Sequence, residues 1–197
     1  NFVLDILATI ETSGFPCRIC YYPPDSGETI KGWLGDQLTY QPQEGGDVGE
    51  RMERAFRRAF SEGVSRAVLI GSDIPDLPPT MFTRAFRSLD DHGAVIGPAL
   101  DGGYYLIGFN KDTFFPGIFS GIEWSTGDVL NRTLQIFEHA GQRVARLPPW
   151  RDVDTVEDLK DLAARNRSIG FGAGRTMNCL AILMNRTGSA EVSDAKI

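Results

Sequence analysis

The clearest indication of the fold comes from residues 66–79, Arg66-Ala-Val-Leu-Ile-Gly-Ser-Asp-Ile-Pro-Asp-Leu-Pro-Pro79. The apolar run from Ala67 to Ile70 is short, made of strand formers and bounded by turn residues. This pattern predicts a strand that is buried on both faces, as in a parallel sheet. Asp73 follows at once, so its carboxylate is expected at the carboxyl end of a central strand, where open α/β sheets bind ligands. The alternative is that Asp73 only caps the turn and Asp76 only starts the next helix.

Length and composition bound the class of protein. The chain has 197 residues, of which 42% are hydrophobic and 23% charged, which suits one globular domain. Its net charge is −6, which argues against nucleic acid as the main partner because phosphate binding needs a basic face. A nucleotide is not excluded, because a metal ion can bridge it to carboxylates.

Two further features concern location. No apolar run reaches about eighteen residues, so we expect no membrane span. The three cysteines are an odd count, which argues against a disulfide framework and favours a cytoplasmic protein. Cys17 and Cys20 form a C-x-x-C motif, but it lies at a predicted strand rather than at a helix N-terminus, and the other zinc ligand types are scattered. We therefore reject a redox pair and a zinc site.

Hydrophobic periodicity predicts helices and strands along most of the chain. Helices are expected at 2–10, at 28–34, from just after Asp47 to about 62, and at 80–89, 128–140 and 156–164. Strands are expected at 18–22, 38–41, 67–70, 93–98 and 143–147. The pattern fails from Arg167. We therefore predict one domain over 1–166 and a C-terminal extension or tail over 167–197. The first helix has no preceding strand, so we expect a further segment upstream.

Carboxylates follow several of these strands. Asp73 and Asp76 follow one, and Asp152 and Asp154 follow another. If both clusters converge on one crevice, they form an oxygen-ligand site suited to Mg²⁺ or Mn²⁺. Asp154 is favoured by the dipole of the next helix whatever its function. Thr155 and Asp158 have the spacing of a capping box.

Two glycine-rich turns are further candidates. Asp101-Gly102-Gly103-Tyr104 follows the strand at 93–98, and its glycines allow a ligand to approach the main chain. Asp101 could hold a hydroxyl or a metal there, or the segment could be only a type I′ hairpin turn.

The second turn lies at 45–49, where Asp47 is a candidate N-cap for the helix that follows. Arg51, one turn into that helix, could reach a phosphate at the helix end or be an exposed partner of Glu50 or Glu53.

Five motifs occur in one order and at close spacing, at 45–52, 70–77, 97–108, 124–126 and 152–159. Together they resemble a bacterial family assigned to the glycosyltransferase-A, or nucleotide-diphospho-sugar transferase, superfamily, which also holds the molybdenum-cofactor and phospholactate guanylyltransferases. The resemblance implies an α/β fold, Rossmann-like and three-layered, with a mostly parallel mixed sheet. Such families open with a strand and a loop rich in Pro, Gly, Lys and Arg that holds the nucleotide phosphates, and the present sequence has no such segment.

The resemblance also implies a set of site residues. Asp73, Asp152 and Asp154 would hold the divalent metal, and a nucleotide diphosphate would bind across it. Asp101, Gly102 and Gly103 would line the sugar or acceptor side, and our own hypothesis is that Asp101 takes the proton from the attacking hydroxyl of a small-molecule acceptor. The donor would contact the residues expected at the strand ends and glycine turns: Gly71, Ser72, Arg51, Gly102, Gly103 and Tyr104.

The leading hypothesis is metal-assisted transfer from a nucleotide-diphospho-sugar. Two alternatives stay open. One is a nucleotidyltransferase that uses a nucleoside triphosphate. The other is a non-catalytic domain that senses a sugar nucleotide.

Overall fold

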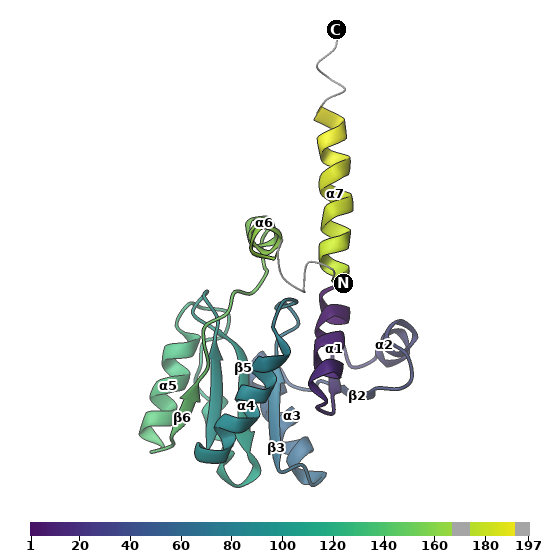
Figure 1. The fold of residues 1–197 in the computed structure, drawn as a ribbon. Helices are drawn as coiled ribbons and strands as arrows, with labels where there is room; N and C mark the ends of the chain where they lie inside the picture. The colour runs from purple at the N-terminus through teal and green to yellow at the C-terminus, as the bar shows by residue number, and fades with distance from the viewer. Residues whose placement is uncertain (167–173, 192–197) are drawn as a thin grey trace.

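The computed structural model of the chain describes residues 1–166 and 174–191 (Figure 1). The helices are α1 (Phe2–Ser13), α2 (Gly27–Leu34), α3 (Val48–Ser61), α4 (Pro79–Asp91), α5 (Val129–His139), α6 (Val156–Arg165) and α7 (Arg175–Glu191), with short 3₁₀ helices η1 (Lys111–Thr113) and η2 (Pro116–Phe119). The strands are β1 (Arg18–Tyr21), β2 (Thr39–Pro42), β3 (Arg66–Ile70), β4 (Ala94–Pro98), β5 (Tyr104–Asn110) and β6 (Val144–Arg146).

The strands form two sheets. A parallel pair joins β1 to β2, and a four-stranded mixed sheet has the order β3-β5-β4-β6. In the larger sheet β5 is antiparallel to both β3 and β4, whereas β6 is parallel to β4. The predicted α/β class with a mixed sheet is therefore confirmed.

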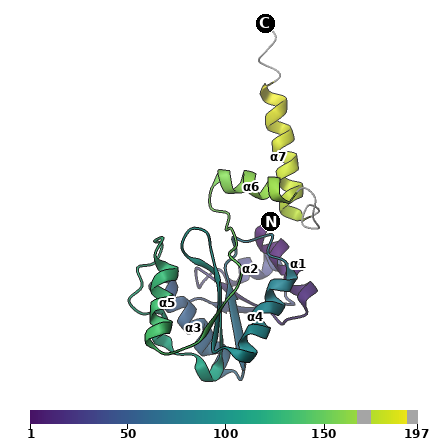
Figure 2. The same ribbon diagram turned by 60° about the vertical axis from the view of Figure 1, so that its left-hand side comes forward.

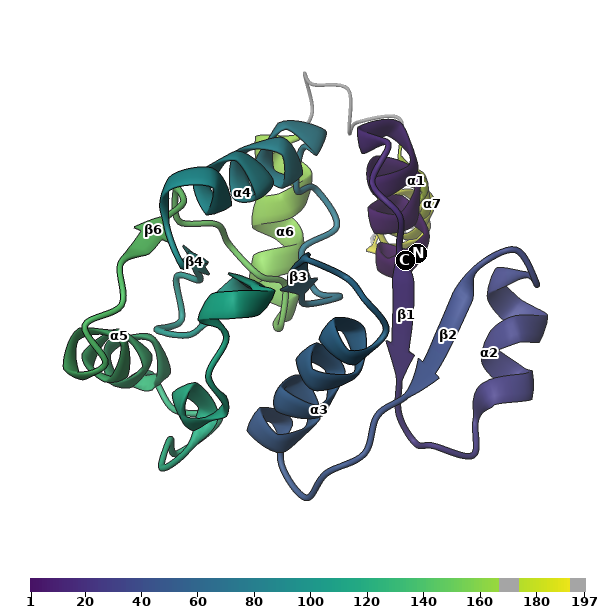
Figure 3. The ribbon, with the colours of Figure 1, turned by 90° about the horizontal axis from the view of Figure 1, so that it is seen from below.

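Helices cover both faces of the four-stranded sheet. Figure 3 shows α1 and α4 on one side of the strands and α3 and α5 on the other. The α4 side buries a core of aliphatic residues that includes Leu77, Leu89 and Leu106, and the α3 side buries an aromatic core that includes Phe56 and Phe109. Both cores follow from the amphipathic stripes of these helices, which face the sheet.

The environment predicted for β3 is wrong. Its apolar residues Ala67 to Ile70 are only half-buried, and β3 pairs antiparallel with β5 at the edge of the four-stranded sheet. Within the described residues its other edge has no strand partner. An apolar run shows that a strand is partly shielded, but it cannot show which strands lie beside it.

Local signals placed the helix ends correctly. Gly14 ends α1 in the left-handed conformation, with φ of 74°. Asp47 caps α3 by accepting a hydrogen bond of 2.8 Å from the backbone N–H of Glu50. Thr155 and Asp158 form the expected capping box at the start of α6.

The C-terminal part contains a helix where the sequence predicted an extension or tail. Figures 1 and 2 show α7 pointing away from the sheet, while α6 lies across the top of it. Asp5 of α1 is buried and accepts hydrogen bonds of 2.8 Å from the backbone N–H groups of Arg175 and Thr176, so it caps α7 from another helix. The glycine-rich stretch at 170–173 and the end of the predicted tail, 192–197, lie outside the described residues.

No helix in the described ranges is both long enough and apolar enough to cross a membrane.

Candidate functional site

Three of the predicted carboxylates lie together. Asp101, Asp152 and Asp154, here called the carboxylate trio, each offer an oxygen, and these three oxygens lie within 4.8 Å of one another. Asp101 comes from the loop between β4 and β5, and the other two come from the segment between β6 and α6. Segments about fifty residues apart in the sequence therefore meet at one end of the sheet.

Backbone hydrogen bonds hold the segment after β6 in place. The N–H of Trp150 donates to the carbonyl of Pro98 at 2.9 Å, so the segment continues alongside the end of β4. The N–H of Val153 then donates to the carbonyl of Asp73, also at 2.9 Å. This second bond joins the loop after β3 to Val153, which lies between Asp152 and Asp154 in the sequence.

The loop that carries Asp101 depends on its glycines. Gly102 has φ of 93°, and a Cβ there would lie 2.7 Å from the carbonyl carbon of Gly127. The N–H of Gly103 donates to Oδ1 of Asp101 at 2.8 Å. Since β4 and β5 are antiparallel, this loop does close a hairpin, but the predicted type I′ turn is wrong, because only Gly102 of Asp101, Gly102 and Gly103 has a positive φ. The hairpin nevertheless carries Asp101 into the trio.

The trio is electrostatically unbalanced. Among the described residues, no Lys or Arg forms an ion pair with any of its three members. Burial, together with the negative charges of Asp101 and Asp154, raises the pKa of Asp152 to about 6. A protein that gathers carboxylates without a cation lowers its own stability, which is common at ligand sites.

Asp73 lies beside the trio but is not one of its members. Burial raises the pKa of Asp73, and the charges of Asp154 and Asp101 add to the rise, so the three carboxylates are close enough to interact. A Cβ on Gly71 would lie 2.5 Å from Oδ1 of Asp73, so the glycine leaves room for this side chain to fold back. Ser72 between them is exposed.

Asp76 turns away from this group, which corrects its place in the first predicted cluster. Its buried carboxylate accepts hydrogen bonds from Arg165, Asn166 and Trp150, at 2.9, 2.8 and 3.0 Å. Burial by itself would raise the pKa of Asp76, but these hydrogen bonds outweigh burial and lower it. Asp76 therefore ties the loop after β3 to α6. The sequence pattern gave no sign of this network because its members lie up to 90 residues apart.

The turn before α3 gathers aromatic and basic side chains. The guanidinium of Arg51 lies 3.9 Å from the centre of the Tyr22 ring, and its Nε donates to the carbonyl of Gly45 at 3.3 Å. Arg51 forms no ion pair with Glu50 or Glu53, so that alternative is wrong. A Cβ on Gly49 would lie 2.6 Å from Cε2 of Trp124, so this indole packs against the first turn of α3.

Tyr104 and the two N-terminal cysteines are explained by packing. The ring of Tyr104 packs against the aromatic core, with its hydroxyl 4.0 Å from Sδ of Met52, and burial raises its pKa. Burial also raises the pKa of the Cys17 and Cys20 thiols, the opposite of the change that activates a cysteine.

Comparison with solved structures supports the fold. A protein from Desulfovibrio desulfuricans G20, provisionally described as a nucleotide-diphospho-sugar transferase, is 42% identical, with a TM-score of 0.88 over 100% of this chain and 84% of its own. The 4-diphosphocytidyl-2C-methyl-D-erythritol synthase of Anaerococcus prevotii DSM 20548 is 13% identical, with a TM-score of 0.59 over 83% of each chain. Rv0371c of Mycobacterium tuberculosis H37Rv, solved with manganese, is 16% identical, with a TM-score of 0.54 over 82% of this chain and 86% of its own.

Among the curated proteins none matches the chain. A family model described as "Uncharacterized protein conserved in bacteria (DUF2064)" matches residues 6–126. The chain therefore belongs to the DUF2064 family and has the fold of the nucleotide-diphospho-sugar transferases.

Proposed function

We propose that this protein is a metal-dependent transferase that takes its donor group from a nucleotide diphosphate. The observation that carries the proposal is the carboxylate trio, whose three oxygens lie within 4.8 Å and have no cationic partner in the described part of the chain. An all-oxygen donor set suits Mg²⁺ or Mn²⁺ better than zinc or copper, which prefer nitrogen and sulfur ligands.

The geometry favours a division of roles that differs from the expected one. Asp101 joins Asp152 and Asp154 as a metal ligand, because these three oxygens are the ones that converge. Asp73 lies outside the trio and is the carboxylate left to accept the proton of an attacking hydroxyl. A bound divalent ion supplies charge neutralisation for a diphosphate leaving group.

The residues around the trio bind and orient the donor. Gly102 and Gly103 hold Asp101 in the trio, since Gly102 packs against the backbone of Gly127 and the N–H of Gly103 donates to the Asp101 carboxylate. Gly71 leaves room for the Asp73 side chain, and the exposed Ser72 lies beside it as a candidate contact of the donor. Arg51 lies near the N-terminus of α3, where free backbone N–H groups and the helix dipole both favour a phosphate.

Two relatives support the choice of donor and metal. The 42% identical Desulfovibrio protein carries the description of a nucleotide-diphospho-sugar transferase. The manganese in Rv0371c belongs to a protein that shares the fold alone. Within this class we infer glycosyl transfer, and nucleotidyl transfer is the second candidate because the Anaerococcus neighbour is a synthase of a diphosphocytidyl product.

Product analysis tests the proposal. The protein is incubated with Mn²⁺, a panel of nucleotide-diphospho-sugars and a panel of hydroxyl acceptors, and nucleoside diphosphate is measured by chromatography. Parallel reactions contain nucleoside triphosphates and sugar phosphates, and pyrophosphate is measured. Release of nucleoside diphosphate supports glycosyl transfer, and release of pyrophosphate supports nucleotidyl transfer.

A matched pair of variants ties any turnover to the trio. Asp152→Asn removes one charge from the trio, and Asp112→Asn removes one from the exposed η1. We expect loss of product for the first and unchanged product for the second. Donor binding that needs Mn²⁺ but gives no product on any panel would instead favour a sugar-nucleotide sensor.

A further inference from the structure

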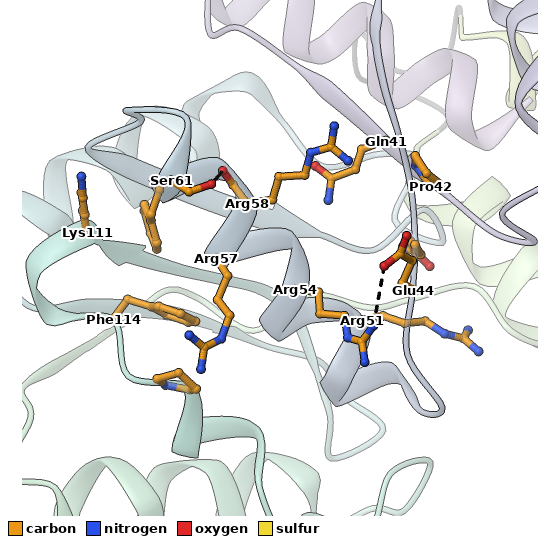
Figure 4. A pocket seen from close by; sticks show the side chains of 13 residues that line it. Gln41, Pro42, Glu44, Arg51, Arg54, Arg57, Arg58, Ser61, Lys111 and Phe114 are labelled. Atoms are coloured by element: carbon orange, nitrogen blue, oxygen red, sulfur yellow. Dashed lines mark hydrogen bonds and ion pairs between the residues drawn. The ribbon is translucent and has the colours of Figure 1, made fainter.

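A basic groove follows the outer side of α3. It has a volume of about 700 Å³ and is lined from α3, from the chain around the end of β2, and from the η1–η2 segment; we call it the arginine groove. Figure 4 shows the arginines of α3 spread along it, with Glu44 toward one end and Lys111 toward the other. Its lining residues that matter here are Arg51, Arg54, Arg57, Arg58, Lys111 and Glu44.

The charge of the groove is opposite to that of the chain. Four arginines and one lysine line it against the single carboxylate of Glu44, while the whole chain has a net charge of −6. Three of the arginines have carboxylate partners: Arg54 with Glu44 at 3.6 Å and Glu50 at 3.9 Å, Arg57 with Glu53 at 2.7 Å and Arg58 with Glu62 at 3.0 Å. These are four carboxylates against the five cations of the groove. Lys111 has none among the described residues. The groove therefore keeps an excess of positive charge.

These ion pairs do not close the groove to an anion. The side chains of Arg54, Arg57 and Arg58 are 53–57% exposed. Ion pairs at such exposure are weak, and an incoming carboxylate can replace them at little cost. A planar guanidinium also binds a carboxylate through two parallel hydrogen bonds.

Apolar side chains form the other part of the lining. Phe60 is buried, and Phe114 packs against it with ring centres 5.3 Å apart, so this part of the wall is fixed. Pro42 and Pro116 add rigid apolar surface on the two sides of α3. A mixture of fixed apolar surface and arginines is typical of protein recognition sites.

The arginine groove is elongated, and the end of it that contains Lys111 is far from the carboxylate trio. Arg51 to Ser61 of α3 spans about 15 Å at the rise of an α-helix. Lys111 follows the end of β5 that pairs with the start of β4, whereas Asp101 lies beyond the other end of the same hairpin. A length of about 15 Å accommodates roughly five residues of extended chain.

We propose that the arginine groove binds an acidic, extended segment of a partner protein, with an apolar side chain of that segment against Phe114. Charge complementarity favours glutamate and aspartate, and the apolar wall favours a peptide over a polyphosphate or a nucleic acid, which offer few apolar groups. The proposal does not depend on the activity of the trio.

Fluorescence anisotropy with a labelled peptide tests this. The probe has six glutamates around one phenylalanine, and a second probe replaces every glutamate with glutamine. We expect the acidic probe to bind, the glutamine probe not to bind, and affinity to fall as salt rises. The test variant combines Arg54→Gln with Arg57→Gln and should bind about ten-fold more weakly.

The control combines Arg84→Gln with Arg87→Gln on α4, which removes the same charge from exposed positions on the other face of the sheet. It should bind the acidic probe like the unmodified protein, and thermal melts should show that both variants fold. Equal binding by the test and control variants, or no binding by the unmodified protein, would overturn the proposal. Tighter binding of a single-stranded oligonucleotide or of polyphosphate than of the peptide would also overturn it.

Discussion

The carboxylate of Asp76 accepts a hydrogen bond of 2.9 Å from Nε of Arg165, which lies 89 residues later in the chain. The Asp76 side chain is 3% exposed and that of Arg165 is 26% exposed, so the pair is well shielded from water. Removing Asp76 leaves Arg165 with the less buried Asp161, at 2.7 Å, as its remaining ionic partner. This contact holds the loop after β3, which carries Asp73, to the end of α6, the helix that follows Asp152 and Asp154.

Replacement of Asp76 should therefore destabilise the fold. We expect Asp76→Asn to lower the free energy of unfolding by about 2–3 kcal/mol, because Arg165 loses its buried partner. Urea denaturation followed by tryptophan fluorescence measures this. Asp90→Asn removes an exposed ion pair with Arg66 and should cost less than about 1 kcal/mol. Equal losses in the two variants would mean that the Asp76 network is not a structural link.

The same residue gives a pH dependence with a definite sign. The hydrogen bonds from Arg165, Asn166 and Trp150 outweigh burial and lower the pKa of Asp76 in the folded protein. Its contribution to stability is therefore full above the ordinary carboxyl pKa of about 4 and is lost as pH falls through the lower folded value. The difference in unfolding free energy between the unmodified protein and Asp76→Asn should shrink below pH of about 4. A difference that grows on acidification would contradict this assignment.

Asp5 should control the docking of α7. Its carboxylate binds the backbone N–H groups of Arg175 and Thr176, so Asp5→Ala leaves two helix-terminal donors without a partner. We expect a loss of about 1–2 kcal/mol and faster amide exchange in α7, measured by hydrogen exchange with mass spectrometry. Glu11→Ala, an exposed change on the same α1, should leave exchange in α7 unchanged.

We expect that no side chain fits at position 49, because the indole of Trp124 packs against Gly49. A Cβ at Gly49 would lie 2.6 Å from Cε2 of the indole, so Gly49→Ala forces Trp124 to move and should cost about 1–3 kcal/mol. Near-UV circular dichroism reports the displaced ring, and denaturation gives the cost. Gly32→Ala in α2 meets nothing within 4 Å and should be neutral or stabilise the helix. Similar effects at both positions would show that the indole does not restrict Gly49.

The sequence predicted most of the elements, because turn residues and amphipathic stripes act locally. The Asp47 cap and the capping box at Thr155 are examples. Neighbour relations could not be predicted in this way. The edge position of β3 depends on how β5 folds back, and the position of Asp76 depends on α6. The residues near β3 and Asp76 in the sequence therefore determine neither feature.

For the candidate site, too, the residues could be predicted from local sequence but their arrangement in space could not. The pattern of aspartates after strands singled out Asp73, Asp76, Asp152 and Asp154, and the glycine-rich turn singled out Asp101. The structure brings Asp101, Asp152 and Asp154 together with Asp73 beside them, whereas Asp76 binds α6. Which three oxygens converge depends on the hairpin loop and on the Val153–Asp73 hydrogen bond. The arginine groove was missed, although Arg51, Arg54, Arg57 and Arg58 recur at helical spacing in the sequence and could have indicated a basic stripe.

Titration of Mn²⁺ into the full chain, with free Mn²⁺ measured by electron paramagnetic resonance, shows whether the carboxylate trio holds a divalent metal. We expect one tight site in the unmodified protein and in Asp112→Asn, and at least about ten-fold weaker binding in Asp152→Asn, since one of three carboxylate ligands is lost. Identical Mn²⁺ binding by Asp152→Asn and the unmodified protein, with both variants folded, would contradict a metal site at the trio.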